Sequence, residues 1–417
     1  MYRDGSLTRL FEPVKGAGLQ GSGLFDFSIL VCPNLLHLLY TKIMDKFFSI
    51  SCQHDTAQAV INDCVRQFDA ALIDANFGFI YATDAMSADF PQLLKQCKDA
   101  TSIEHWIGSV GLGVITAGQE LYDLPAASIM LAKFDADEFT MVPSISKQSD
   151  IASRLHWPRK FATNFGVIHG DPLNPQTQGL IEAIQKQLDN GFIVGGLTSS
   201  LGNYYQVADD VISGGISGAL FSENIGVITN LSQGCSPVGE KHTITNAKEN
   251  IAFLLDKKPA LEVLMQDMNI SDYQELEQKA GEVFIGLCIS GSDISDYTVR
   301  NLVGVDLKHN IFAINDYMAE GNEIVFCRRN KRTAVDDMQQ MLDNIAGRLN
   351  QQPGQQPRGG LYISCLGRGR EQFGNHSEEI KMIQKTLGDF PLTGFFANGE
   401  IHHNKLYGYT GVLTLFI

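Results

Sequence analysis

The chain has 417 residues, of which 44% are hydrophobic and 19% charged, so its composition is that of a globular protein with two or more domains. The formal net charge of −15 argues against a nucleic-acid partner, because phosphate contacts require clustered Lys and Arg. The eight cysteines include no pair at C-x-x-C spacing, so no zinc ribbon or thioredoxin-type motif is visible. A reducing cytosol fits this cysteine usage best.

Residues 1–43 differ from the sequence that follows them. Their apolar run LFDFSILVCPNLLHLLY is interrupted by Pro33 and is short for a membrane span. It also lacks the compact basic start and the cleavage site of a signal peptide. We therefore expect a natural start at Met44, a dispensable leader over 1–43 and no membrane attachment.

The order strand, helix, strand, strand occurs three times. It is read in residues 77–134, in residues 165–222 and in the C-terminal segment that begins GGLYISCLGRGREQFG. The helix of the second copy has apolar residues at helical spacing, namely Leu180, Ile181, Ile184 and Leu188. A divergent repeat of about 55–60 residues, too irregular for a solenoid, predicts an α/β fold of mixed sheets built from one repeated module.

Glycines gather in the second strand of each copy. They are Gly108, Gly111, Gly113 and Gly118 in the first copy, Gly195 and Gly196 in the second, and Gly394 and Gly399 in the third. Glycine weakens a strand unless a bulge, a bend or a close backbone approach requires it. One interpretation is tight packing against a neighbouring helix. The other is a ligand lying on exposed backbone, which makes Gly111, Gly195 and Gly196 candidate binding residues.

Residues 223–359 separate the second copy from the third and contain three further strand-like runs and two helices. The turn-rich loop after Gly234 and Cys235 suggests a domain boundary near residue 245. We therefore predict two lobes, 44–245 with two modules and 246–417 with the inserted strands and the third module.

Common catalytic motifs are missing from the sequence. Gly111-x-Gly113 and Gly367-x-Gly369 do not complete a dinucleotide fingerprint, and no P-loop, H-E-x-x-H or G-x-S-x-G occurs. We therefore expect a protein that is not an enzyme. The alternative is an enzyme acting on a small acidic metabolite through the Gly/Arg-rich loop and Cys365, although a cysteine inside a strand is commonly a buried structural residue.

Polar residues cluster in two glycine-bearing turns of the third copy. Arg368 and Arg370 flank Gly369, and Asn398 and Glu400 flank Gly399. Arginine in such a turn can bind a carboxylate of a ligand, or it can form a salt bridge with Glu371, Glu378 or Glu379. Asn398 can equally serve the Asn-Gly turn itself.

Three long segments resemble FIST proteins, which join a FIST N domain to a FIST C domain. They are SQGCSPVGEKHTITNAKENIAFLLDKKPALEVL, GGLYISCLGRGREQFG and PLTGFFANGEIHHNKLYGYTGVLTLF, and the resemblance covers about residues 45–417. It implies a cytoplasmic bacterial sensor of a small molecule that regulates a histidine kinase or a cyclic-dinucleotide enzyme. The bacterial nitric-oxide-sensing group (NosP) is similar in architecture, and this similarity implies haem as a possible cofactor.

Haem would require an axial ligand, commonly an imidazole. No spacing rule selects one of the ten histidines, and no C-x-x-C-H for covalent attachment occurs. His403 is the candidate iron ligand, because FIST relatives often keep a histidine in the segment FANGEIHHN. Neighbouring residues of a strand point to opposite faces, so we expect at most one of His402 and His403 to face a given pocket.

Overall fold

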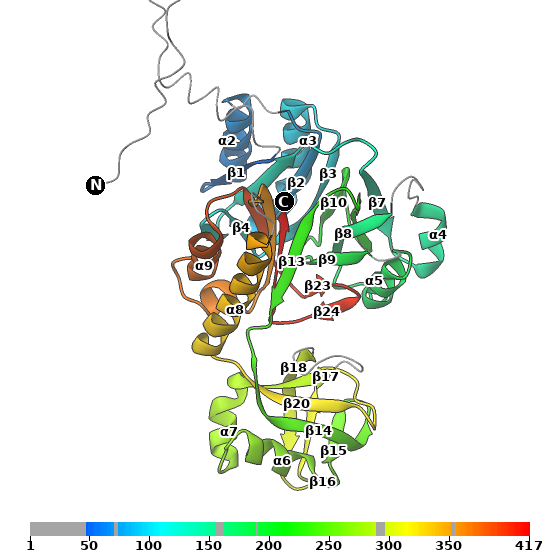
Figure 1. Cartoon of the computed structure of the whole chain (residues 1–417), viewed down its shortest axis with the longest axis vertical. Helices are drawn as coiled ribbons and strands as arrows, with labels where there is room; N and C mark the ends of the chain where they lie inside the picture. The colour runs from blue at the N-terminus through cyan, green and yellow to red at the C-terminus, as the bar shows by residue number, and fades with distance from the viewer. Residues whose placement is uncertain (1–46, 71–73, 156–161, 189–190, 289–296, 352–354) are drawn as a thin grey trace, which may run out of the picture. The chain divides into compact units, whose positions relative to one another are not determined.

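The computed structural model describes residues 47–417 except 71–73, 156–161, 189–190, 289–296 and 352–354, so the predictions on residues 1–43 lie outside the described residues. The described residues form four sheets in two lobes, here called the three-module lobe and the inserted lobe, 236–328 (Figure 1). The predicted fold class is confirmed: the chain is α/β, with mixed sheets built from repeated modules.

Each module has the order strand, helix, strand, helix, strand, hairpin, strand, which extends the predicted repeat by one strand and one helix at its start. The first module comprises β1 (Phe47–Gln53), α2 (Ala57–Ala70), β2 (Phe77–Thr83), α3 (Phe90–Thr101), β3 (His105–Gly111), β4 (Gly113–Thr116), β5 (Gln119–Tyr122) and β6 (Ala126–Ala132). In it β2 and β3 are parallel, and β6 returns antiparallel to β2.

The other two modules repeat this arrangement. The second comprises β7 (Phe139–Ile145), α4 (Ile151–Arg154), β8 (Thr163–Gly170), α5 (Thr177–Gln185), β9 (Phe192–Leu197), β10 (Gln206–Ala208), β11 (Asp210–Ile212) and β12 (Ile216–Ser222). The third comprises β13 (Val227–Ser232), α8 (Lys331–Asn350), β21 (Gly359–Cys365), α9 (Glu378–Leu387), β22 (Leu392–Ala397), β23 (Glu400–His402), β24 (Lys405–Tyr407) and β25 (Gly411–Phe416). The parallel pairs are β8 with β9 and β21 with β22.

The hairpins are exchanged between modules. The sheet orders are β1-β6-β2-β3-β10-β11, β7-β12-β8-β9-β23-β24 and β13-β25-β21-β22-β4-β5. Each sheet therefore ends in a hairpin from another module: the first receives that of the second, the second that of the third, and the third that of the first. The third module consequently shares one lobe with the first two.

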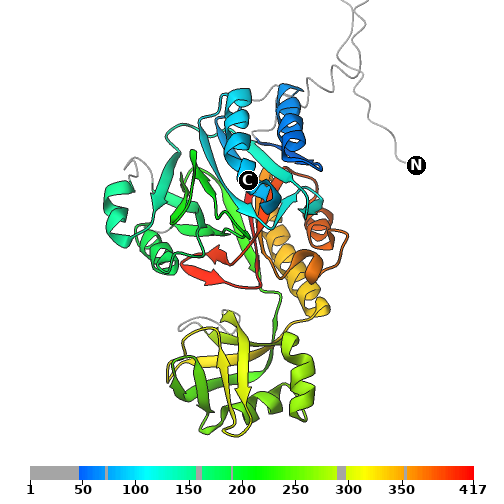
Figure 2. The same ribbon diagram turned by 180° about the vertical axis from the view of Figure 1, so that it is seen from behind.

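The three sheets share one apolar core. Their inner faces contribute a single cluster that includes Phe77, Phe165, Phe395 and Phe416, all fully buried. Each outer face is covered by its own helix pair, α2 with α3, α4 with α5, and α8 with α9 (Figures 1 and 2). Strands buried on both faces are near-continuous apolar runs, and for this reason β2, β12 and β22 can be recognised as strands from the sequence.

One glycine per module makes the parallel pairing possible. Gly108, Gly195 and Gly394 lie opposite Ile80, Ile168 and Tyr362 in the registers of the three parallel pairs. A Cβ at any of them would lie 1.7–1.8 Å from the carbonyl oxygen of the opposite residue. Close packing therefore explains these glycines, although the close neighbour is the backbone of the adjacent strand and not a helix.

The inserted lobe is a closed ring of antiparallel strands with its own core. Its elements are β14 (Ser236–Lys248), β15 (Ile251–Leu255), β16 (Lys258–Pro259), α6 (Ala260–Asp267), α7 (Tyr273–Lys279), β17 (Val283–Cys288), β18 (Tyr297–Asp306), β19 (Ile311–Ile314) and β20 (Glu323–Arg328). The ring runs β14-β20-β17-β18-β19-β15 and closes through β14 and β15. Residue 245, the predicted boundary, lies within β14.

Within the described part of the chain, no helix combines the length and the apolar character needed to cross a bilayer.

Candidate functional site

The carboxyl ends of β21 and β22 define one edge of the third sheet. The two strands are parallel, and directly beyond them the Leu366 amide donates to the Ala397 carbonyl at 3.0 Å. Ligands of α/β sheets commonly bind beyond the carboxyl ends of parallel strands. The turns that hold the predicted residues Arg368 and Asn398 leave the sheet at this edge.

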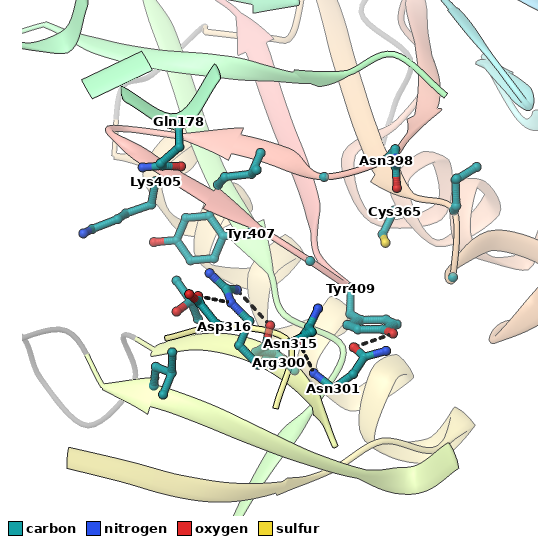
Figure 3. Close-up of a pocket in the computed structure, with 18 of the residues that line it drawn as sticks. Gln178, Arg300, Asn301, Asn315, Asp316, Cys365, Asn398, Lys405, Tyr407 and Tyr409 are labelled. Atoms are coloured by element: carbon teal, nitrogen blue, oxygen red, sulfur yellow. Dashed lines mark hydrogen bonds and ion pairs between the residues drawn. The ribbon is translucent and has the colours of Figure 1, made fainter. Parts of the chain in front are cut away.

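A cavity of about 1020 Å³ lies at this edge, and we call it the edge cavity (Figure 3). The third module contributes Cys365, Leu366, Gly367, Asn398, Gly399, Lys405, Leu406, Tyr407, Gly408 and Tyr409, the inserted lobe contributes Leu287, Cys288, Thr298, Val299, Arg300, Asn301, Asn315 and Asp316, and α5 contributes Gln178. Its volume is close to the upper limit of small-molecule sites, which span roughly 300–1,000 Å³.

Some polar groups of the edge cavity are paired and others are free. Arg300 Nε donates to Asp316 at 2.6 Å, and the Tyr409 hydroxyl donates to Asn301 Oδ1 at 2.8 Å, as Figure 3 shows. Among the described residues, the side-chain amide of Asn398 and the Lys405 ammonium have no hydrogen-bonding or ionic partner. Two cations and one carboxylate give the walls a net positive charge, in a chain whose net charge is −15.

Cys365 lines the edge cavity, and the Glu400 carboxyl lies close to its thiol. Burial, together with the nearby Glu400 carboxyl, raises the pKa of the Cys365 thiol to about 12. Glu400 is fully buried behind the lining, and burial raises its pKa to about 8 although the Thr410 amide and hydroxyl both donate to its Oε2. Its Oε1 has no hydrogen-bond partner among the described residues. At neutral pH the thiol is therefore protonated, and so is most of the carboxyl.

The two predicted arginines do not line the edge cavity. Arg368 is fully buried, and its Nε donates to Glu379 at 2.8 Å. Arg370 is partly exposed, pairs with Asp123 and lies over the Tyr122 ring. For Arg368, the salt bridge that the sequence offered as the alternative to ligand binding is the observed contact. Arg370 also forms one of the salt bridges considered, with Glu371 at 3.5 Å, in addition to its pair with Asp123 of the first module.

The other predicted binding residues are divided between the cavity and the core. Asn398 lines the edge cavity, and Glu400 lies directly behind its wall. Gly111, Gly195 and Gly196 are buried in closely packed strands, where an added Cβ would meet other atoms within 2.8 Å. None of these three glycines lines the edge cavity.

His403 and His402 line a second cavity of about 680 Å³, which we call the α8 cavity. Its lining also includes Asn230, Leu231, Gln233, Asp337, Gln340, Met341, Asn344, Asn404, Lys405 and Tyr407. The expectation that at most one of the two histidines faces a given pocket is wrong. Strand β23 ends at His402, and His403 has a left-handed φ of 56°, so strand alternation does not apply to it.

The α8 cavity meets only part of what haem requires. Burial lowers the pKa of His402 to about 3, so its imidazole is neutral, which is the form that binds iron. The walls, however, are mainly amide and other polar side chains, whereas haem has two large apolar faces. The described lining of the edge cavity contains no histidine at all. The residues present therefore do not fit haem well in either cavity.

Sequence reasoning missed the half of the edge cavity that the inserted lobe supplies. Arg300, Asn301 and Asp316 lie in or beside β18 and β19, where nothing in their local pattern distinguishes them from solvated strand ends. Lys405 and Tyr409 lie in the C-terminal segment that resembles FIST proteins, but no motif in that segment distinguishes them. Only the folded chain brings them to the same edge as Asn398.

Comparison with known families is consistent with this architecture. The FIST N domain matches residues 76–258, and the FIST C domain matches residues 260–403. The boundary between the two matches therefore falls inside the inserted lobe. The chain belongs to the FIST family, whose domains are associated with sensory, ligand-binding signal transduction and are generally sensory rather than catalytic.

The chain is also similar to bacterial proteins that are themselves uncharacterised. One from Mycobacterium tuberculosis H37Rv is 29% identical over 327 residues, covering 75% of this chain and 83% of its own length. Another, from Mycobacterium bovis, is 27% identical over 323 residues, covering 75% of this chain and 82% of its own length.

Proposed function

We propose that this chain is a cytoplasmic sensor that binds a small, singly anionic polar ligand in the edge cavity. The observation that carries the proposal is that both lobes line this cavity, with free polar groups at the carboxyl edge of β21 and β22. A ligand held by Arg300 and Asn398 would contact both lobes at once. Binding would then favour one arrangement of the lobes, which a partner protein can recognise.

The proposed partner is a histidine kinase or a cyclic-dinucleotide enzyme, as the family resemblance implies. A catalytic role has less support. Cys365 does face the edge cavity, but with a pKa of about 12 its thiol is not the thiolate that nucleophilic catalysis requires. Turnover of a small acid by the purified protein would favour the enzyme instead.

The binding test is a calorimetric titration of the full chain with a panel of small carboxylates. Replacing Arg300 with Met or Asn398 with Ala should weaken binding. For Arg300 we expect a loss of roughly ten- to a hundredfold, because a hydrogen bond to an ionised group contributes about 1.5–3 kcal/mol. The matched control is Arg332→Met, since Arg332 is an exposed arginine outside the cavity. Unchanged affinity in both cavity variants, with intact folding, would place the site elsewhere.

A haem-based form of the proposal has nitric oxide as the signal and His403 as the iron ligand. It is supported by the family resemblance and by the histidines of the α8 cavity, and it is opposed by the polar walls there. Purification with haem supplied, followed by an absorbance spectrum, tests it. Without a Soret band, and without a shift on adding nitric oxide, only the organic-ligand sensor remains.

A further inference from the structure

The α8 cavity has features of a binding site that is separate from the edge cavity. One stripe of α8 lines it with Asp337, Gln340, Met341 and Asn344, at helical spacings of three and four residues. The facing walls come from β13 with the loop after it, and from the hairpin β23–β24. Only Lys405 and Tyr407 are shared with the edge cavity.

Several polar groups of the α8 cavity have no partner in the described chain. His402 Nε2 is buried and makes no hydrogen bond, although a buried polar atom without a partner is costly. The side-chain amides of Gln340, Asn344 and Asn404 are exposed to solvent and make no intramolecular hydrogen bonds within the described residues. A bound molecule with several hydrogen-bonding groups would give His402 Nε2 a partner and would replace water at these amides.

The charge of the α8 cavity limits the class of ligand. Asp337 is the one acidic residue of the described lining and Lys405 the one Lys or Arg, so their charges have opposite signs, and burial keeps His402 neutral. The Asp337 carboxylate already has intramolecular hydrogen bonds, since its Oδ2 accepts from Ser232 Oγ at 2.6 Å and from the Gly234 amide at 3.1 Å. Walls without net charge offer little to a small anion or a metal cation.

We propose that the α8 cavity binds an uncharged polyhydroxylated molecule, a monosaccharide or a related polyol. Hydroxyl groups both donate and accept hydrogen bonds, as the amides that surround the cavity do. The lining also includes one aromatic residue, Tyr407, a residue type that can contact the C–H side of a sugar ring. The cavity volume of about 680 Å³ is ample for one such molecule.

The test uses the full chain and a fixed set of probes: glucose, ribose, myo-inositol and trehalose, with phosphate and citrate as charged comparisons. Saturation-transfer NMR at millimolar probe concentration should detect binding of at least one uncharged probe and of neither charged one in this cavity. Replacing Gln340 or Asn344 with Leu should weaken that binding about five- to tenfold or more, because a hydrogen bond is lost.

Gln339→Leu is the matched control, because Gln339 lies on the same helix, is bonded to Asp343 and does not line the cavity. His402→Gln provides a second cavity variant if a leucine variant fails to fold. The proposal is overturned if no uncharged probe binds, or if one binds equally to the control and to the cavity variants. It is also overturned if phosphate or citrate is the probe that Asn344→Leu releases. Gln340 and Asn344 lie outside the edge cavity, so these results do not depend on the function proposed for it.

Discussion

Residue identity decides which charged groups of the third module are structural. Glu379 is fully buried and accepts from Arg368, from the Tyr362 hydroxyl at 2.6 Å and from the Gly369 amide at 2.7 Å. These donors satisfy the hydrogen-bonding capacity of the buried carboxylate, and the positive charge of Arg368 balances its negative charge. The Gly/Arg-rich turn is therefore held in place by Glu379 of α9.

Arg368→Ala should destabilise the protein strongly, by about 3–5 kcal/mol, because it leaves the buried Glu379 charge unpaired. Arg370→Ala should cost far less, since its pair with Asp123 is partly exposed and such pairs contribute about 0–1 kcal/mol. Urea denaturation followed by circular dichroism measures both variants. If the two variants lost the same free energy of unfolding, the Arg368–Glu379 pair would not be the main stabilising contact of this turn.

Glu400 should make stability depend on pH. Its pKa is raised from 4.5 to about 8 by burial, so the folded protein holds a proton that the unfolded chain releases. The favourable contribution is complete below pH 4.5 and is lost as the pH rises through 8. Relative to the wild type, Glu400→Gln should therefore gain stability between pH 5 and pH 8. Denaturant titrations at several pH values measure the difference, and parallel curves for the two proteins would contradict the assignment.

At the scale of elements, the parallel pairs depend on one glycine each. Gly108, Gly195 and Gly394 occupy the same position in three modules whose sequences have otherwise diverged. The common reason is the distance between backbones, because a methyl group there would overlap a carbonyl oxygen of the adjacent strand. The repeat is therefore constrained by strand packing and not by a ligand.

Alanine at Gly108, Gly195 or Gly394 should abolish or severely impair folding in each case, since the strands would have to separate to admit the Cβ. Gly304→Ala is the control, because Gly304 lies in β18 and has nothing within 4 Å of its added Cβ. Soluble yield and melting temperature report the effect. A variant of any of the three that melts like the control would show that the sheet adapts more easily than expected.

On the scale of the whole molecule, the two lobes have separate cores. The clusters beneath and between the three sheets contain no residue of 236–328, and the inserted lobe has its own cluster. A smaller apolar cluster joins the two lobes, and in it Phe284 packs against Tyr409. The two ends of the insertion are adjacent, because Ser236 pairs with Arg328. Because its two ends are adjacent, the inserted lobe can be accommodated without changing the fold of the three-module lobe.

Replacing residues 237–327 with an Asn-Gly turn should therefore leave the three-module lobe folded. The shortened chain should melt cooperatively, and the amides of β21 should remain protected in hydrogen exchange. Ligand binding in the edge cavity should be lost, because Arg300 and Asn301 are removed. A shortened chain that is unfolded would mean that the inserted lobe is required for folding, contrary to the separation of the cores.

The order of strands and helices within a module, and the α/β class of the fold, could be predicted from the amino-acid sequence. Buried strands are long apolar runs, α5 and α8 have helical apolar spacing, and glycines mark the parallel pairs, so each of these signals is local. The resemblance to FIST proteins likewise rests on contiguous segments. Asn398 could be selected as a candidate binding residue because it flanks Gly399 in a glycine-bearing turn of the third copy.

The exchange of hairpins between sheets, and the contacts between side chains of distant segments, could be seen only in the folded structure. The hairpin exchange joins residues such as His402 and Val194 that are far apart in the chain, and no local pattern encodes that pairing. Arg368 and Arg300 are both arginines near glycines, yet one is buried against Glu379 and the other lines the edge cavity. Their difference depends on which neighbours pack around them, and those neighbours come from distant segments of the chain.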